Sequence, residues 1–420
     1  RYTTIRVLLA LVAQEGLHVA QMDVTTAFLN AELSPEDKIY IRLPAGYDDG
    51  TGAVYRLQRA LYGLRQSPRY WHLLAVSTFN STGAEQSARD PSLFFWRNGG
   101  GGGMAFAYMY VDDVIMACSD RATLTKLKAR FLAEYEGRDL GTPTQFCGMA
   151  ITLGPGYVRL GQRLLIEQMV SRFGLEAAAP CASPFAAGTE LLPEGEPLDT
   201  QQHPYSSLVG VLLYIANSTR PDIAYACSTL AAQAARPTKA AWLAALRVAR
   251  YLKGTAGYTL VYGRGSKELL VYSDADYAGD KGTRRSRSAF AQILGGGAVA
   301  WGSKLQKTVA LSTAEAEVVA LTIATKETIW LRAILSDLGY TSGPTKVYTD
   351  NQAALALANS GVISTRTKHI DVAYHFCKEC IDAGTIQISY LGTNDMVADS
   401  LTKPVPHAKH EFCRKAMGLQ

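Results

Sequence analysis

Carboxylate side chains stand at the ends of several apolar, strand-like runs in this sequence. Two are adjacent in YMYVDDVIMA, residues 108–117, and single aspartates end similar runs at Asp23, Asp274 and Asp350. A carboxylate at a strand end lies at the rim of a sheet, where it can face a cleft on rigid backbone. Clustered oxygen ligands suit Mg²⁺ or Mn²⁺, two of which, about 3.5–4 Å apart, can assist an in-line phosphoryl displacement. Because aspartate also favours turns, a structural role stays open for each residue taken alone.

The adjacent pair Asp112 and Asp113 needs a local explanation. Neighbouring strand residues point to opposite faces, so one of these carboxylates would enter a core if the strand ran straight through. Burying an unpaired charge is costly. We therefore predict a tight turn centred on Asp112 and Asp113, which presents both carboxylates at one solvent-accessible spot.

A second acidic group lies nearer the C-terminus. Glu315 and Glu317 are about 200° apart on a helix of 3.6 residues per turn, so both cannot face the same sheet. Glu317 falls on the more apolar side of that helix, where a carboxylate needs a cation or another partner. Glu317 is therefore the better candidate ligand, and Asp399 could complete a site of four carboxylates with Asp274 and Asp350.

The hydrophobic periodicity predicts the elements that would position these residues. Helices are expected at 3–14, 67–83, 121–137, 206–218, 240–254, 312–338, after 351 and at 369–383. Strands are expected at 17–24, 92–96, 104–111, 114–118, 269–276, 288–297, 298–305, 345–350 and 385–392, with a glycine-rich hairpin loop at 99–103. Ser67 is the expected N-cap of its helix and Pro68 its first helical residue. The pattern predicts an α/β (α+β) chain whose second strand-rich unit is a mixed sheet covered by helices, and a linker at 177–203.

Composition narrows the class of protein. The 420 residues suffice for two or three domains, and 48% hydrophobic with 19% charged residues is typical of a globular chain. A net charge of +5 is a mild bias toward anionic partners. Seven scattered cysteines favour a reducing compartment over a disulfide framework, and no apolar run approaches the length of a membrane span. The chain begins at Arg1 within a helical pattern, so we expect a piece of a longer protein.

Several segments together resemble one family. They include QMDVTTAFLNAEL, LYGLRQSPRYW, YVDD, YSDADYAGDKGTRRS, LSTAEAEVVAL, TDNQAALALA, TRTKHIDVAYHF and ADSLTK. In order and spacing the chain is similar to the reverse transcriptase and ribonuclease H region of copia-type LTR retrotransposon Pol polyproteins, truncated at its N-terminus. The resemblance implies a right-hand polymerase palm with partial fingers at 1–153, thumb and connection elements at 154–265, and a ribonuclease H-like domain at 266–420.

The resemblance also implies roles for residues of the polymerase. Asp23, Asp112 and Asp113 would bind two Mg²⁺ or Mn²⁺ ions, with Asp112 the firmer ligand. Phe28 would exclude the ribose 2′-hydroxyl, unless it is an ordinary core aromatic. The residues lining the nucleotide and template would be Tyr62, Gly63, Arg65, Gln66, Ser67 and Pro68. Arg65 and Arg69 would contact phosphates, or else be solvated charges at a helix end.

In the ribonuclease H-like domain, the resemblance assigns two further metal ions to Asp274, Glu317, Asp350 and Asp399. Arg284, Arg285 and Arg287 are expected to contact phosphate, although a solvated loop is the alternative. His369 and His375 are expected to pack or to contact nucleic acid rather than to catalyse. Cys377 and Cys380 form a CxxC pair, but a zinc site is not expected because four ligands at suitable spacing are absent.

The implied function is an RNA-directed DNA polymerase fused to ribonuclease H, intracellular, in a cytoplasmic particle or the nucleus. Its partners would be an RNA template, a primer, an RNA–DNA hybrid and dNTPs, with integrase, protease and capsid parts upstream in the same polyprotein. Only 22 residues precede Asp23, so the fingers that grip the triphosphate are not expected in this chain. Two alternatives therefore stay open: a catalytically idle nucleic-acid-binding remnant, and a protein with ribonuclease H activity alone.

Overall fold

A computed structural model describes residues 1–47, 50–97, 103–189, 191–192, 194–263, 266–340, 343–360 and 371–420. These residues form two compact units. The small unit contains Leu17–Pro143 and Asp337–Gly339, and the large unit contains Arg1–Gly16, Thr144–Ser336 and Tyr340–Gln420. Each unit mixes helices and strands, as the α/β class predicts. Within the described residues, no helix combines the length and the apolar character needed to cross a membrane.

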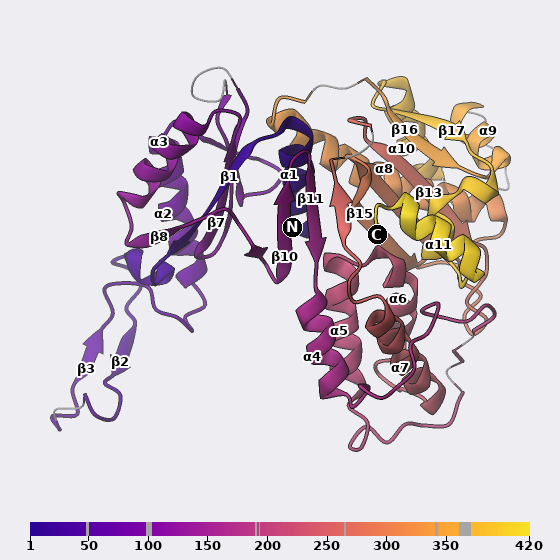
Figure 1. Cartoon of the computed structure of the whole chain (residues 1–420), viewed down its shortest axis with the longest axis horizontal. Coiled ribbons are helices and arrows are strands. Elements are labelled where there is room, and N and C mark those ends of the chain that lie inside the picture. The colour runs from indigo at the N-terminus through magenta and orange to yellow at the C-terminus, as the bar shows by residue number, and fades with distance from the viewer. Residues whose placement is uncertain are drawn as a thin grey trace. The chain divides into compact units, whose positions relative to one another are not determined.

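An antiparallel six-stranded sheet forms the centre of the small unit (Figure 1). Its strands follow the order β4-β5-β6-β7-β1-β8. Their bounds are β1 His18–Val24, β4 Glu85–Gln86, β5 Leu93–Phe95, β6 Ala105–Tyr110, β7 Asp113–Cys118 and β8 Gly137–Gly141. The unit also contains α2 Ser67–Ser81, α3 Arg121–Leu132, the short helix η1 Ala27–Asn30, and a ribbon of β2 Tyr40–Arg42 and β3 Val54–Arg56.

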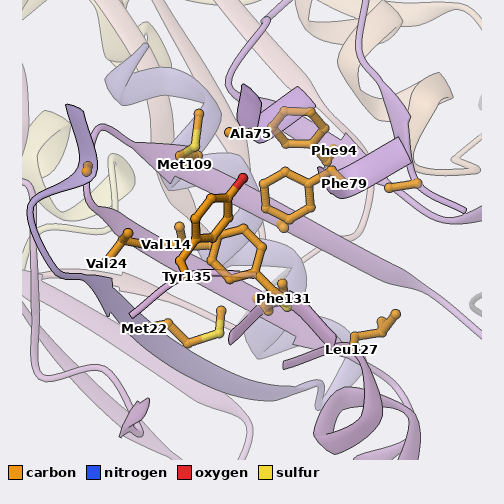
Figure 2. Close-up of a cluster of buried hydrophobic side chains, with 14 of the residues drawn as sticks. Met22, Val24, Ala75, Phe79, Phe94, Met109, Val114, Leu127, Phe131 and Tyr135 are labelled. Atoms are coloured by element: carbon orange, nitrogen blue, oxygen red, sulfur yellow. The ribbon is translucent and has the colours of Figure 1, made fainter. Parts of the chain in front are cut away.

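Helices α2 and α3 cover one face of this sheet through an aromatic core (Figure 2). Phe79 of α2 stacks on Phe94 of β5 at 4.1 Å and on Phe131 of α3 at 4.9 Å between ring centroids. Met22 and Val24 of β1 contribute to the same core. Because side chains alternate along a strand, the residues between them, including Asp23, lie on the opposite face of the sheet.

A mixed five-stranded sheet forms the C-terminal part of the large unit, in the order β15-β14-β13-β16-β17. Strands β13, β14 and β15 pair antiparallel, whereas β16 pairs parallel to both β13 and β17. The strand bounds are β13 Leu270–Asp276, β14 Arg287–Leu294, β15 Gly297–Leu305, β16 Thr345–Thr349 and β17 Ile386–Tyr390. The helices here are α8 Thr313–Asp337, α9 Gln352–Ser360, α10 Asp371–Asp382 and α11 His407–Ala416, with the short helices η5 Thr393–Asp395 and η6 Val397–Leu401.

The rest of the large unit combines a second sheet with a group of helices. The sheet has the order β12-β11-β10-β9, with bounds β9 Gln145–Phe146, β10 Met149–Gly154, β11 Tyr157–Gly161 and β12 Leu260–Tyr262. The helices are α1 Tyr2–Glu15, α4 Arg163–Arg172, α5 Tyr205–Ser218, α6 Ala224–Ala232 and α7 Lys239–Gly254, with the short helix η3 Pro221–Ile223. Helices α4–α7 lie side by side and share one apolar core (Figure 1).

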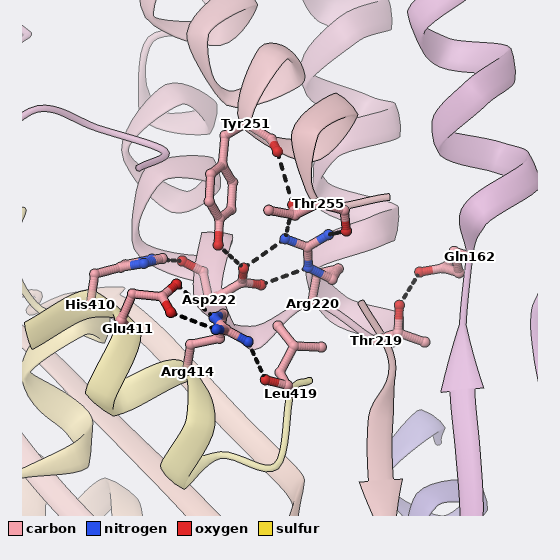
Figure 3. Close-up of polar contacts among 10 residues, drawn as sticks. All are labelled: Gln162, Thr219, Arg220, Asp222, Tyr251, Thr255, His410, Glu411, Arg414 and Leu419. Atoms are coloured by element: carbon pink, nitrogen blue, oxygen red, sulfur yellow. Dashed lines mark hydrogen bonds and ion pairs between the residues drawn. The ribbon is translucent and has the colours of Figure 1, made fainter. Parts of the chain in front are cut away.

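A buried ion pair lies beside that helical core (Figure 3). The Arg220 guanidinium donates to both carboxylate oxygens of Asp222, at 2.9 and 2.7 Å, and both side chains are almost fully buried. Tyr251 of α7 donates its hydroxyl to Asp222 at 2.6 Å, and Thr255 accepts from Arg220. His410 of α11 lies 3.1 Å from the Asp222 carbonyl. The network therefore joins α7 and η3 to the C-terminal helix.

Helix α1 is buried within the large unit, where its one cation, Arg6, finds acceptors. The Arg6 guanidinium donates to the carbonyls of Val299, Asn217 and Ser218 at 2.7–2.8 Å. Its centre also lies 3.9 Å from the centroid of the Trp301 ring. Three carbonyls and an aromatic face compensate the charge that burial would otherwise leave unsatisfied.

The predicted helices and strands are confirmed in type and order, as is the mixed C-terminal sheet, while the glycine-rich loop lies almost wholly outside the described residues. Three local details were wrong. Ser67 is the first residue of α2, not its N-cap, and Pro68 is the second helical residue, not the first. The Ser67 hydroxyl donates to the Leu61 carbonyl at 2.7 Å. The hairpin turn is formed by Val111 and Asp112, because Asp113 already pairs with Tyr110 as the first residue of β7. The domain boundaries and the right-hand arrangement stay predictions.

Candidate active sites

Three aspartates of the small unit lie around the end of the β6–β7 hairpin. Asp23 of β1 and Asp113 of β7 are directly paired in the antiparallel register, and Asp112 is in the turn. Paired residues on neighbouring strands point to the same face. Asp23 and Asp113 therefore share the face opposite helices α2 and α3.

The turn has an unusual backbone that tertiary contacts hold in place. Val111 has φ of 59°, a region that β-branched residues rarely adopt. The Trp71 indole donates to the Val111 carbonyl at 2.6 Å, and the Val24 amide donates to the Asp112 carbonyl at 2.8 Å. Strand β1 and helix α2 thus fix where the Asp112 side chain begins.

Burial and neighbouring negative charges together shift the pKa of Asp113 on this face of the sheet. Partial burial raises the pKa of Asp113 to about 6, and repulsion from Asp112 and Asp23 adds to the rise. Gln21 opposes it by donating its side-chain amide to Asp113 at 2.7 Å. Arg138 of β8 lies 3.6 Å from Asp23. The carboxylates are therefore supported by one amide and one guanidinium.

The other residues expected to line the polymerase site lie on η1 and at the start of α2. The Phe28 ring is half-buried against the core and lies 4.7 Å from the half-exposed ring of Tyr62. Gly63 has φ of 96°, which glycine adopts without strain. Ser67 is buried, Gln66 is half-buried, and the remaining members of the set are exposed: Arg65, Pro68 and Arg69.

Three carboxylates of the large unit come together at the ends of β13 and β16. Asp274 is in β13, Asp350 directly follows β16, and Glu317 is on the first turns of α8. One oxygen from each lies within 4.8 Å of the other two, and within the described part of the chain this is the one such group of three. Asp23, Asp112 and Asp113 do not approach one another this closely.

Burial dominates the electrostatics of this group. It raises the pKa of Glu317 to about 9, with repulsion from Asp274 and Asp350 adding to the rise. It also raises the pKa of Asp274 to about 6, against the opposing effects of Lys403 and the Thr402 hydroxyl, which donates to Asp274 at 2.5 Å. Glu317 Oε2 is buried without a hydrogen-bond partner. Three oxygen ligands, one of them unsatisfied, fit a hard divalent cation.

Helix α8 explains why Glu317 belongs to this group and Glu315 does not. The Glu315 carboxylate accepts a hydrogen bond from the Leu311 amide at 2.6 Å, before the first residue of the helix. Glu317 instead approaches the sheet, where its Oε1 accepts from the Ala275 amide at 3.3 Å. Glu315 therefore has a capping role at the helix start.

Asp399, the expected fourth ligand, is engaged differently. It is buried on η6, with Oδ1 2.8 Å from the Lys403 ammonium and Oδ2 3.2 Å from that of Lys409. It lies outside the group formed by Asp274, Glu317 and Asp350. Two ammonium groups thus compensate its charge within the fold.

The residues expected to contact nucleic acid are not equivalent. Arg284 is exposed and Arg285 half-buried, on the loop before β14. Arg287 is buried, donates to Ser228 of α6 at 2.8 Å, and has its guanidinium 5.1 Å from the centroid of the Tyr225 ring. Arg287 is thus committed to packing α6 against the sheet, which corrects its expected place on a phosphate-facing surface. His369 lies outside the described residues.

The sequence patterns did not predict several residues that contact the carboxylates of these sites. Arg138 has no local signal, because only the pairing of β1 with β8 brings it to Asp23. Gln21 lies two residues before Asp23, on the same strand face, and this spacing could have indicated it. Lys403 is four residues after Asp399, a spacing that predicts contact on a helical turn. Lys409 comes from α11 and could not be predicted.

Comparison with known proteins identifies the family. Residues 1–187 match the family described as reverse transcriptase (RNA-dependent DNA polymerase). The retrovirus-related Pol polyprotein of transposon TNT 1-94 from Nicotiana tabacum is 37% identical over 100% of this chain, which spans 32% of that polyprotein. Those of transposons RE2 and RE1 from Arabidopsis thaliana are 34% and 33% identical over 98% and 99% of the chain, which spans 28% of each.

This chain therefore spans less than a third of the length of these relatives. The similarity nevertheless covers residues of both units. The chain belongs to the family of retrovirus-related Pol polyproteins of copia-type transposons, and its N-terminal region belongs to their reverse transcriptases.

Proposed function

We propose that this chain acts in reverse transcription, with two catalytic sites. The small unit copies RNA into DNA, and the large unit cleaves the RNA strand of the resulting RNA–DNA hybrid. The polymerase proposal is supported by the reverse transcriptase match of residues 1–187. The nuclease proposal rests on one observation, the convergence of Asp274, Glu317 and Asp350 around the unsatisfied Glu317 Oε2.

The residues of the large unit have separable tasks in hybrid cleavage. Asp274, Glu317 and Asp350 supply the oxygen ligands for Mg²⁺ or Mn²⁺. Thr402 orients Asp274 through its hydrogen bond of 2.5 Å, and Thr393 donates to Asp350 at 2.9 Å. When bound, a pair of divalent ions would activate the attacking water and stabilise the leaving oxygen. The substrate would be distinguished from DNA by its 2′-hydroxyl.

In the small unit, the proposed tasks follow the paired strands. Asp23 and Asp112 would hold the ions that serve the primer terminus and the incoming dNTP. Asp113 would support them less directly, because Gln21 holds its carboxylate. Phe28, packed beside Tyr62, would form the floor against which a deoxyribose fits.

Two activity assays on the purified chain test this proposal. Primer extension on an RNA template with Mg²⁺ should depend on Asp112, so that Asp112→Asn loses product while Glu134→Gln, which changes an exposed carboxylate of the same unit, keeps it. Cleavage of the labelled RNA strand of a hybrid should depend on Asp350. Asp350→Asn should fall to the metal-free background, and Asp395→Asn, at an exposed neighbouring position, should not.

A nuclease acting alone is the second candidate function. It is favoured by the difference between the two acidic groups, since the large-unit carboxylates converge within 4.8 Å and those of the small unit do not. Hybrid cleavage without any primer extension would select this candidate. Loss of both activities in the unmodified chain would overturn the enzyme proposal and leave a nucleic-acid-binding remnant.

A further inference from the structure

Asp399 forms ion pairs with Lys403 and Lys409, and these ion pairs bear on how the large-unit site takes up cations. The Asp399 carboxylate is 2% exposed, and each of its oxygens faces one ammonium group. A buried carboxylate needs a compensating charge to remain ionised. Here the chain itself supplies that charge through two ion pairs, whereas Asp274, Glu317 and Asp350 form no ion pair with another described residue.

The two lysines are held to very different degrees. Lys409 donates to the carbonyls of Thr393 and Asn394, at 2.7 and 2.8 Å, in addition to its ion pair with Asp399 at 3.2 Å. Its side chain is 19% exposed. Lys403 forms its ion pair with Asp399, and 39% of its side chain is exposed. Lys409 is therefore anchored, whereas Lys403 can turn toward solvent on its flexible stem.

Lys403 also lies close enough to the carboxylate group to act on it electrostatically. The adjacent residue, Thr402, hydrogen-bonds to Asp274, which places the Lys403 backbone beside that ligand. The Lys403 ammonium interacts electrostatically with Asp274 and Glu317 as well as with Asp399. A divalent ion shared by Asp274 and Asp399 would meet this ammonium at close range, and like charges there repel.

We propose that Lys403 is a positioning residue that serves as the resident cation between Asp274 and Asp399, so that the site takes up divalent ions in two unequal steps. The first ion binds to Asp274, Glu317 and Asp350. The second recruits Asp399 after Lys403 has turned away from it. This inference rests on the proposed function of the three carboxylates as metal ligands.

Manganese titration of the full chain tests this order of uptake. Calorimetry should be carried out in an Asp112→Asn background, to weaken binding at the small-unit aspartates. We expect the second ion to bind at least about tenfold more weakly than the first. Lys403→Met should tighten the second ion by at least about tenfold and the first by less, because it removes one full charge next to the second position. Lys403→Arg, which keeps the charge, should stay close to the parent protein.

A matched lysine provides the control. Lys378 forms an ion pair with Asp382 at the same spacing of four residues, on the surface of α10. Lys378→Met should leave both affinities unchanged, and metal-free thermal unfolding should show that each variant folds. Two ions of equal affinity in the parent protein would overturn the inference, as would a Lys403→Met variant with unaltered second binding.

The failure of this inference can be distinguished from that of the nuclease proposal. If the three carboxylates are not ligands, Glu317→Gln will leave the Mn²⁺ isotherm unchanged. If they are ligands but Lys403 does not oppose the second ion, Glu317→Gln will weaken binding while Lys403→Met has no effect. The expected result requires both variants to change the isotherm, in opposite directions.

Discussion

Replacing Asp222 by Asn should destabilise the large unit strongly, because it leaves the Arg220 guanidinium buried without its counter-charge (Figure 3). The closest charged atoms are 2.7 Å apart, which corresponds to about 6 kcal/mol of attraction at an effective dielectric constant of about 20. Part of this is offset because Thr255 still accepts from Arg220. Removing one partner of such a pair typically costs about 3–5 kcal/mol in the free energy of unfolding, and we expect that range here.

Peptide-resolved hydrogen exchange at increasing urea concentrations measures this loss in the free energy of unfolding. Peptides from α5 and α7 report on the large unit, and peptides from β6 serve as an internal reference in the small unit. Glu196→Gln is the matched control, because it breaks the exposed ion pair with Lys239 and should cost less than about 1 kcal/mol.

The double variant Arg220→Met with Asp222→Leu separates the charge effect from loss of packing. It removes both charges and fills similar volume with apolar atoms, so it should recover most of the stability that Asp222→Asn loses. The reasoning would be refuted by an Asp222→Asn variant within about 1 kcal/mol of the parent, or by a double variant as unstable as the single one.

Three further outcomes are expected, one in the Asp222 network and two in the small unit. Burial alone would raise the pKa of Asp222, but Arg220 and Tyr251 outweigh it and the pKa is lowered. The stabilisation from Asp222 is therefore complete above its unfolded pKa near 4 and is lost as the pH falls through the lower folded value, so the deficit of Asp222→Asn in peptide-resolved exchange should shrink below about pH 4. Phe79→Ala should lower the free energy of unfolding by about 3–5 kcal/mol. Urea-dependent hydrogen exchange should show this loss only in peptides of the small unit. Trp71→Phe removes the hydrogen bond to the Val111 carbonyl in the turn, so primer extension should fall. The free energy of unfolding should decrease by only about 1 kcal/mol.

Much of the fold followed from local patterns, because those patterns coincide with what the tertiary structure needs. The apolar, β-prone runs at 17–24 and 114–118 correctly predicted β1 and β7, and the 3.6-residue period correctly predicted α7 and α8. The same period placed Glu317 rather than Glu315 toward the sheet. The helix predictions succeed because burial of one face determines both the sequence pattern and the structure.

The details that failed depend on contacts between distant segments. Val111 lies in the turn despite its β-branched side chain, because Trp71 donates to the Val111 carbonyl and Val24 donates to the Asp112 carbonyl. Arg287 is buried because both faces of β14 are covered, so alternation along that strand carries no signal about exposure. Arg138 reaches Asp23 only through the pairing of β1 with β8.

The acidic groups of the two units solve the same electrostatic problem with different partners, and this difference bears on what each can bind. Around Asp23 and Asp113, the supporting groups are a neutral amide and one guanidinium at 3.6 Å. Around Asp399, two ammonium groups lie within 3.2 Å, whereas burial and the neighbouring carboxylates raise the pKa of Glu317. The large-unit site thus combines three carboxylates, the proposed ligands, that form no ion pair with another described residue and a fourth carboxylate that forms two. A cation entering it gains most at the three, which is why the order of uptake, rather than the number of carboxylates, should distinguish this site.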